Sequence, residues 1–282
     1  MNIIMQQSFD KERALYGIKE TKITDCSFSG PEDGESVLKE ARDIIVEKSN
    51  FSLRYPLWHV KGFKLDEIVM DEFSRAPIWY SSNGIITHTQ INSIKAIREC
   101  NDISLADSEI ESSEFGWMSQ NINIKDSKIS GEYLFLRSDN VILDKVKMTG
   151  KYSFQYMSGL IIRDSILDTK DAFWHSENVT VENSLVKGEY LGWFSKNLTL
   201  INCHIIGTQP FCYCEGLKLV DCIMEDTDLA FEYSEVNVSV KGHIHSVKNP
   251  KSGLIIADSV GEVIMDDAVM ECKGEVRIRN ND

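Results

Sequence analysis

The chain has 282 residues, of which 42% are hydrophobic and 26% charged, a composition typical of a soluble globular protein. Its formal net charge of −14 at pH 7 would repel a phosphate backbone, which excludes nucleic acid as an expected partner. The amino-terminal segment lacks the apolar core of a signal peptide, and no run reaches the roughly 18 apolar residues that cross a bilayer, so we predict a cytoplasmic protein with no membrane partner.

The seven cysteines predict neither a disulfide framework nor a metal site, because their number is odd and their spacing is not one of the usual zinc patterns. The pair Cys212 and Cys214, and the 19-residue interval between Cys203 and Cys222, come nearest to such a pattern. We predict instead that these cysteines pack as small buried hydrophobic residues. No cofactor is predicted.

The first predicted element is an amino-terminal cap over residues 1–19, and a repeat begins at Glu20. Each repeat starts at one marker residue, usually Asn or Gly, which is followed by alternating apolar and polar residues. The early markers are Glu20, Asp43 and Gly62, and the 23-residue interval between the first two contains the insertion PEDG at 31–34. After a 21-residue interval the spacing becomes a constant 19, with markers at Asn83, Asp102, Asn121, Asn140, Gly159, Asn178, Asn197, Gly216 and Glu235.

Columns of similar residues define the repeat. Apolar residues stand one and three places after the marker, as in a half-buried strand: Ile103/Leu105, Ile122/Ile124, Val141/Leu143, Leu160/Ile162, Val179/Val181 and Leu198/Leu200. Small residues stand six places after most markers: Ser108, Ser127, Ser165, Ser184, Cys203 and Cys222. Short strands and sharp corners in a 19-residue unit predict a parallel β-helix, in which like residues of successive coils stack.

We therefore predict an all-β, single-stranded right-handed parallel β-helix that forms a single domain over residues 1–282. The coils, about 13 in number, occupy residues 20–260, and a carboxy-terminal cap occupies residues 261–282. The hand of winding is predicted by analogy with parallel crossover connections. Caps are expected because an open end of a solenoid exposes unpaired strand edges.

The second strand region of each coil precedes the marker. Residues six, four and two places before it are mostly apolar or small and are expected to point inward. The intervening residues are expected to form an outward strip, which reads Tyr133-Phe135-Arg137, Tyr152-Phe154-Tyr156, Asp171-Phe173-His175, Tyr190-Gly192-Phe194, Gln209-Phe211-Tyr213 and Asp228-Ala230-Glu232. Such an exposed patch marks an interaction site. The alternatives are packing under a loop, a homo-oligomer interface, or a reversed parity that turns the strip inward.

A strip of aromatic rings and carboxylates suits a sugar, whose C–H face packs on a ring while the acids bind its hydroxyls. The predicted ligand-binding residues are Tyr152, Tyr156, Tyr190, Tyr213 and Glu232. The candidate catalytic residues are Asp171, Glu189 and His175, since two carboxylates roughly 5 to 9.5 Å apart can hydrolyse a glycoside. The alternative is solvated surface charge, because 44 acidic residues will form pairs by chance.

Six segments of the sequence resemble a known family: ERALYG (12–17), LRYPLWH (53–59), RAPIWY (75–80), KDAFWHSENVTV (170–181), GEYLGWFSKNLTLINC (188–203) and LAFEYSEV (229–236). The family is the bacterial domain of unknown function family 3737, and the resemblance spans nearly the whole chain. It implies a right-handed β-helix of the pectin-lyase-like type and implies no activity. His175 and Phe194 stand where the family usually has Asn.

Two functions follow as hypotheses. In the first, the strip binds, and in an enzyme would modify, a carbohydrate or glycoconjugate. In the second, the protein is structural and uses the strip to form a homo-oligomer.

Overall fold

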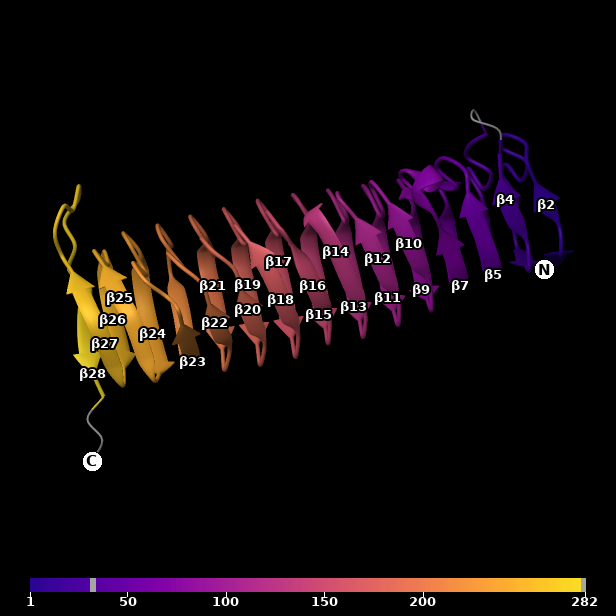
Figure 1. The fold of residues 1–282 in the computed structure, drawn as a ribbon. Helices are drawn as coiled ribbons and strands as arrows, with labels where there is room; N and C mark the ends of the chain where they lie inside the picture. Colours follow the sequence, from indigo (N-terminus) through magenta and orange to yellow (C-terminus); the bar gives the residue numbers. More distant parts are fainter. Residues whose placement is uncertain (31–33, 280–282) are drawn as a thin grey trace. The chain divides into compact units, whose positions relative to one another are not determined.

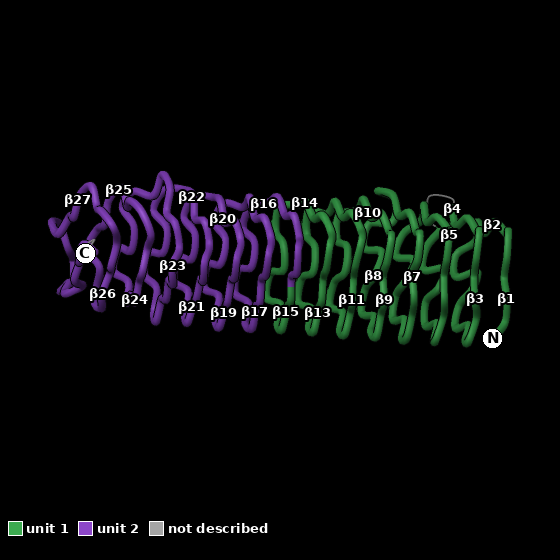
Figure 2. The backbone as a smooth tube through the Cα atoms, turned by 90° about the horizontal axis from the view of Figure 1, so that it is seen from below, with its two compact units in different colours: residues 1–142 green, residues 143–282 purple. Residues whose placement is uncertain are grey.

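The computed structural model describes residues 1–30 and 34–279, and their regular structure is almost entirely β-strand (Figure 1). The helical element among these residues is one short 3-10 helix, η1 (Glu72–Ser74). The chain divides into two compact units, unit 1 at residues 1–142 and unit 2 at residues 143–282 (Figure 2). Strand β15 (Asp139–Asp144) contains the division between them. The described residues include no helix long and apolar enough to span a membrane.

Unit 1 is a parallel β-solenoid. Residues one coil apart pair directly, such as Ile103 with Ile122 and Leu105 with Ile124, so the predicted 19-residue coil is confirmed. Its strands are β1 (Asn2–Met5), β2 (Ser8–Phe9), β3 (Thr21–Thr24), β4 (Ser27–Ser29), β5 (Arg42–Ser52), β6 (Leu57–Trp58), β7 (Lys61–Met70), β8 (Ile78–Trp79), β9 (Ser82–Thr87), β10 (Gln90–Ser93), β11 (Asn101–Ala106), β12 (Glu109–Ser112), β13 (Gln120–Lys125) and β14 (Lys128–Tyr133).

The coil pattern of unit 1 begins earlier than the sequence intervals predict. Strand β1 pairs with β3 and β2 pairs with β4, so that Ile4 aligns with Ile23 and Phe9 with Phe28. Residues 1–19, predicted as a cap, thus contain strands of a further coil, and the chain has about 14 coils rather than 13. The reason is a corner at Gln6, which takes the left-handed conformation of Asp25 one coil later.

Unit 2 continues the same pattern of parallel pairing, with Leu160 beside Val179 and Val179 beside Leu198. Strands β27 and β28 pair with β25 and β26, so residues 261–278, predicted as a cap, also contain coil strands. Its strands are β16 (Lys147–Lys151), β17 (Ser158–Arg163), β18 (Ile166–Lys170), β19 (Glu177–Glu182), β20 (Leu185–Lys187), β21 (Lys196–Ile201), β22 (His204–Ile206), β23 (Leu217–Glu225), β24 (Glu235–Lys241), β25 (His243–Lys248), β26 (Ser252–Ala257), β27 (Ser259–Ile264) and β28 (Glu275–Ile278).

The interior is built from the predicted columns. Leu160, Ile162, Val179 and Val181 are completely buried, as the strand alternation predicts. The small-residue column stacks as well. The backbone N–H of Ser165 donates to Ser184 Oγ (3.0 Å), and the Ser165 hydroxyl donates to the carbonyl oxygen of Arg163 (2.7 Å). Each hydroxyl thereby satisfies backbone groups at a corner that would otherwise be buried without partners.

Marker residues form the opposite corner, where they take the left-handed conformation: φ is 56° at Asn178 and 53° at Asn197. Asparagine tolerates this region better than most residues. The side-chain amide of Asn197 also donates to Asn178 Oδ1 one coil earlier (3.1 Å). The sequences NVT at 178–180 and NLT at 197–199 match the acceptor motif for glycosylation, and the corner geometry explains why Asn stands at both positions.

Candidate functional site

The region before each marker is a turn with alternating left-handed residues, and this changes which side chains face outward. In one coil Phe173 and His175 have φ values of 65° and 53°. Period-2 alternation applies to an extended strand and fails in such a turn. Phe154, Phe173 and Phe211, expected to face outward, are instead buried in the core. Their neighbours one place earlier also point inward, so the predicted parity is wrong at this position.

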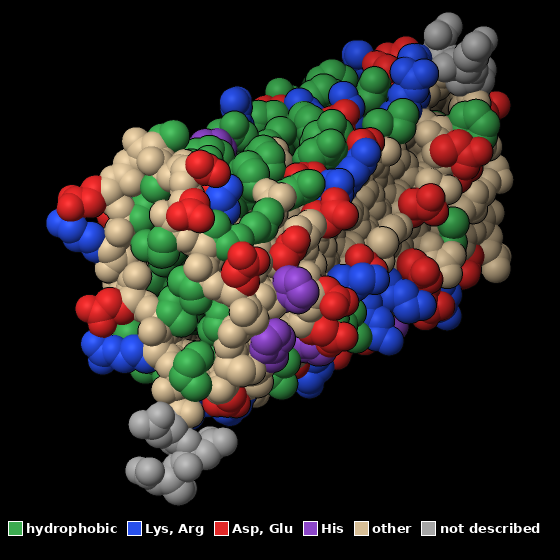
Figure 3. Space-filling view, turned by 60° about the vertical axis from the view of Figure 1, so that its left-hand side comes forward, with side chains coloured by type: hydrophobic (Ala, Val, Ile, Leu, Met, Phe, Trp, Pro, Cys, Tyr) green, Lys and Arg blue, Asp and Glu red, His purple; other side chains and the backbone are tan. Residues whose placement is uncertain are grey.

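The rings three places before the marker form a single column, exposed at its first three members and half-buried at the fourth. Tyr156, His175, Phe194 and Tyr213 stack with ring centroids 4.9, 4.9 and 4.7 Å apart and planes within 10° of parallel. We call these four residues the aromatic ladder. Tyr156 is 53% exposed and Phe194 39% exposed, and His175 is exposed between them. Figure 3 shows that hydrophobic side chains lie among charged ones on the surface in view.

Two tryptophans lie beside the ladder. Trp174 and Trp193 stack at 5.4 Å with planes 6° apart, and both are half-buried although the sequence pattern placed them in the core. Their indole N–H groups donate to the carbonyl oxygens of Tyr190 (2.6 Å) and Gln209 (2.8 Å). These bonds fix the indole rings next to the ladder and satisfy their single polar groups.

The ladder offers ring edges rather than ring faces. Because each inner ring is sandwiched between parallel neighbours less than 5 Å away, its two faces are covered. The expected packing of a sugar C–H face on these rings is therefore unavailable at His175 and Phe194. What remains outward is the electropositive edge of each ring, together with hydroxyl and imidazole groups that can form hydrogen bonds.

The candidate catalytic residues do not share one face. Asp171 is only 6% exposed, whereas His175 is exposed in the ladder. Burial raises the pKa of Asp171, while Lys170 opposes this shift and Glu189 adds to it. Glu189 is held by an ion pair, Lys170 Nζ to Glu189 Oε2 at 2.5 Å, and this bond raises the pKa of Lys170. Asp171 and Glu189 lie on neighbouring coils, since the Asp171 N–H donates to the Glu189 carbonyl oxygen (2.9 Å).

The remaining predicted binding residues flank the ladder. Tyr152 and Tyr190 are half-buried, with Lys151 Nζ and Lys170 Nζ 5.2 and 5.3 Å from their respective ring centres. Glu232 pairs with Lys248 (2.9 Å). Burial, with Glu232 nearby, raises the pKa of Tyr213. Within the described residues, no group of three or more His, Cys, Asp or Glu side chains is placed to hold a metal ion.

Sequence reasoning missed the residues that close the ladder. Tyr233 stacks on Tyr213 at 5.5 Å with a tilt of 38°, and only 8% of it is exposed. It follows Tyr213 by 20 residues rather than 19, so a strict column places Glu232 there instead. The lysines Lys170 and Lys248 were also missed. For Lys170 the signal was available, because it stands one 19-residue interval before Glu189.

Unit 1 carries a different strip four places before the marker, in the column that Trp174 and Trp193 occupy in unit 2. Trp58 and Trp79 stack at 5.7 Å, with Lys39 Nζ 4.1 Å from the Trp58 ring centre and the Arg98 guanidinium 5.9 Å from that of Trp79. The guanidinium also lies 5.2 Å from the ring centre of Trp117. Two cations and three rings thus share this stack, and we call these five residues the cation strip.

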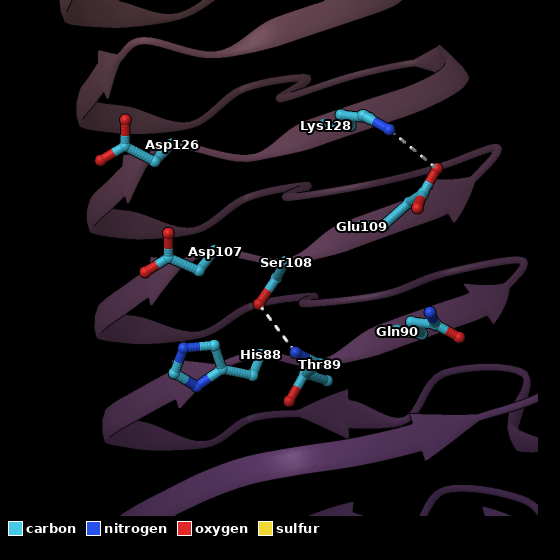
Figure 4. Close-up of a pocket in the computed structure, with 8 residues that line it drawn as sticks. All are labelled: His88, Thr89, Gln90, Asp107, Ser108, Glu109, Asp126 and Lys128. Carbon is cyan, nitrogen blue, oxygen red and sulfur yellow. Dashed lines mark hydrogen bonds and ion pairs between the residues drawn. The ribbon is translucent and has the colours of Figure 1, made fainter.

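A groove of about 460 Å³ lies elsewhere on unit 1 (Figure 4). His88, Asp107 and Asp126 stand along one side, Gln90, Glu109 and Lys128 along the other, and Thr89 and Ser108 form the floor. A second groove of about 400 Å³ repeats this position on earlier coils, around Asp25, Ser27 and Lys48. The groove is therefore a regular feature of the corner, with side chains that vary from coil to coil.

Comparisons with known proteins identify a family but no activity. Residues 2–278 match the model of a family described as "Protein of unknown function (DUF3737)". No curated protein matches the chain. Among solved structures, the chain resembles the catalytic domain of a GH87 alpha-1,3-glucanase in complex with nigerose, with a TM-score of 0.33, 8% identity, and coverage of 98% of this chain and 63% of that one. It thus spans less than two thirds of the glucanase domain.

Two further structures are similar at the same level. The A-module of the mannuronan C-5 epimerase AlgE6 of Azotobacter vinelandii gives a TM-score of 0.32 at 7% identity, covering 98% of this chain and 87% of that one. PfbA, a surface adhesin of Streptococcus pneumoniae, gives 0.32 at 9% identity, covering 93% and 81%. TM-scores this low support no assignment of activity.

Proposed function

The chain belongs to the family described as "Protein of unknown function (DUF3737)", and we propose for it a role that this description leaves open: binding of an uncharged carbohydrate along the aromatic ladder of unit 2. The proposal concerns binding and assigns no bond-breaking step. Of the two candidate carboxylates, Asp171 is buried and Glu189 forms a surface ion pair with Lys170, and the proposal rests on neither of them.

One observation carries the proposal. The ladder exposes hydrogen-bonding atoms that no other part of the protein uses, because the ring nitrogens of His175 and the hydroxyl of Tyr213 form no hydrogen bond to any described residue. Polar edges held rigidly in a row at a surface cost little to order when a ligand binds. Hydroxyl-rich molecules supply both the donors and the acceptors that imidazole and phenol groups require.

The charges around the ladder favour a neutral ligand. Three carboxylates near the ladder are paired with lysines: Glu189 with Lys170 at 2.5 Å, Glu232 with Lys248 at 2.9 Å, and Glu215 with Lys196 at 3.7 Å. A charged ligand would have to break one of these pairs or leave its own charge without a partner. The −14 net charge of the chain further disfavours an acidic polysaccharide.

The test is a glycan array combined with thermal-shift measurements on wild-type protein, Tyr213→Ala and Tyr80→Ala. Tyr80 is the matched control, since it is 43% exposed and contacts the His59 ring but lies in unit 1. We expect uncharged glycans to bind wild-type protein and Tyr80→Ala, with at least about tenfold weaker binding to Tyr213→Ala. Absence of binding by any neutral glycan, or equal losses in both variants, would refute the proposal.

A second copy of the chain is the other occupant to test, because exposed rings are also enriched at protein interfaces. Light scattering over a wide concentration range separates the two outcomes. A monomer that binds glycans supports the proposal, whereas a dimer that Phe194→Ala dissociates assigns the ladder to self-association instead.

A further inference from the structure

Resting on the proposed carbohydrate function, we infer that the ladder binds an extended chain of four sugar units laid across successive coils, rather than one terminal sugar. The three centroid spacings from Tyr156 to Tyr213 are nearly equal, at 4.9, 4.9 and 4.7 Å. They equal the spacing of stacked parallel strands, because each ring belongs to one coil. An extended glycan advances by the length of one sugar ring per unit, which is of the same order, so each unit meets a new ring.

The order of the rings suits a repeating ligand. Tyr156, His175 and Tyr213 present polar edges, and Phe194 presents an apolar edge between the last two. A sugar chain has hydroxyl groups along its length with C–H groups between them, so it can satisfy three polar positions and one apolar position together. A single sugar would contact one or two rings and leave the rest of the strip in water.

The carboxy-terminal end of the ladder limits how far a bound sugar chain can extend past Tyr213. Tyr233, the next ring, is tilted by 38° and only 8% exposed. Its hydroxyl accepts a hydrogen bond from the Val269 N–H (3.2 Å), so the segment around Val269 occupies the position where a fifth sugar would lie. Beside it, the Glu232–Lys248 ion pair closes the flank of Tyr213. In the carboxy-terminal direction the ladder of unit 2 therefore ends at Tyr213.

The experiment is isothermal titration calorimetry of the full chain with three neutral probe series, the cello-, malto- and N-acetylchito-oligosaccharides of two to six units. In a series that binds, we expect at least about tenfold tighter binding of the four-unit member than of the two-unit member. No gain of comparable size is expected between five and six units. Equal affinities for two and four units, with binding present, would overturn the inference while leaving the proposed function intact; no binding in any series would remove both.

A variant tests the continuity of the strip. Phe194→Ala interrupts the ladder between His175 and Tyr213, and we expect it to abolish the advantage of four units while binding of two units changes by less than about threefold. Phe194→Leu keeps an apolar side chain but removes the ring, and should behave likewise if Phe194→Ala folds poorly. Tyr80→Ala should retain the wild-type dependence on length. Retention of that dependence in both Phe194 variants would contradict the inference.

Discussion

The cation strip of unit 1 stands four places before the marker and the aromatic ladder of unit 2 stands three places before it, and these adjacent columns of the coil leave different groups exposed. In unit 1 Lys39 lies against the Trp58 ring, and the Arg98 guanidinium lies between the rings of Trp79 and Trp117. Beside this stack, His59 Nδ1 contacts Glu40 (3.0 Å). In unit 2 four rings follow one another, and the His175 and Tyr213 polar atoms have no protein partner among the described residues. The coil therefore supplies a rigid row of side-chain positions in both units. The side chains at these positions decide whether the polar groups of the row are paired within the protein or available to a ligand.

The largest expected effect is on stability, and it tests whether the two units differ only in their exposed side chains. Phe173 of unit 2 and Phe115 of unit 1 are both completely buried beneath their strips. Replacing either by Ala should lower the free energy of unfolding by about 3–5 kcal/mol, since a cavity replaces a ring in a packed interior. Denaturant unfolding of the two variants measures this loss. A loss below about 1 kcal/mol in one unit alone would show that the two interiors also differ.

The next prediction converts the ladder toward the unit 1 arrangement. Phe194→Arg places a guanidinium between His175 and Tyr213, as Arg98 lies between Trp79 and Trp117. We expect the free energy of unfolding to change by no more than about 1 kcal/mol, because stacked guanidinium groups are tolerated at exposed sites. Binding of a neutral glycan should weaken at least about tenfold, because the row of ring edges is broken. Thermal unfolding and calorimetry on the same variant separate the two effects, and unchanged binding would contradict the comparison.

A smaller effect concerns the paired histidine of unit 1. The hydrogen bond between His88 Nδ1 and Asp66 Oδ1 (2.8 Å) raises the pKa of His88, and with a bond from Thr87 it lowers the pKa of Asp66. The contribution of His88 to the free energy of unfolding is complete below its unfolded pKa of about 6.5, and it is lost as pH rises through the raised folded pKa. The contribution of Asp66 is complete above its unfolded pKa of about 3.9, and it is lost as pH falls through the lowered folded pKa.

We therefore expect the melting temperature of wild-type protein to exceed that of His88→Gln most between about pH 4 and 6.5, with a smaller difference above this window. Melting curves of both proteins across this range provide the measurement. A difference that grows with rising pH would show that the imidazolium is not stabilised by Asp66.

The smallest expected effect is the change of glycan affinity with salt concentration. If a neutral glycan binds the ladder beside balanced ion pairs, its dissociation constant should change by less than about twofold between about 50 and 500 mM NaCl. The control is the Lys170→Ala variant, which leaves Glu189 without its partner and should introduce a dependence on salt for any charged probe. Strong weakening of the wild-type complex by salt would indicate a charged ligand instead.

The repeat and its interior could be read from the sequence because each coil aligns its neighbours at a fixed interval. The serine column at Ser165 and Ser184 is an example, since one small residue per coil at a corner has a single geometric explanation. The outward face could not be read in the same way. Aromatic residues such as Phe173 and Phe194 take left-handed conformations that their residue type disfavours, so no local propensity signals the turn.

The ends of the ladder depended on contacts that spacing does not encode. Tyr233 departs from the 19-residue interval by one position, and its hydroxyl accepts a hydrogen bond from Val269, which lies 36 residues further along the chain. The covering of the ring faces was likewise not predictable from a list of aromatic residues, because it requires their planes to be parallel. The column of exposed rings could thus be located from the sequence, while the ring edges and polar atoms that it exposes required the structure.

The constant coil length has a consequence for how such a surface can change. A deletion of 19 residues, such as 178–196, would join Glu177 to Asn197 and shorten the stack by one ring, with every remaining column still aligned. A deletion of 18 or 20 residues would turn core side chains toward water along the next strand. The aligned columns are therefore kept only when the chain gains or loses whole coils. Evolution can lengthen or shorten the row of exposed rings by one complete coil at a time.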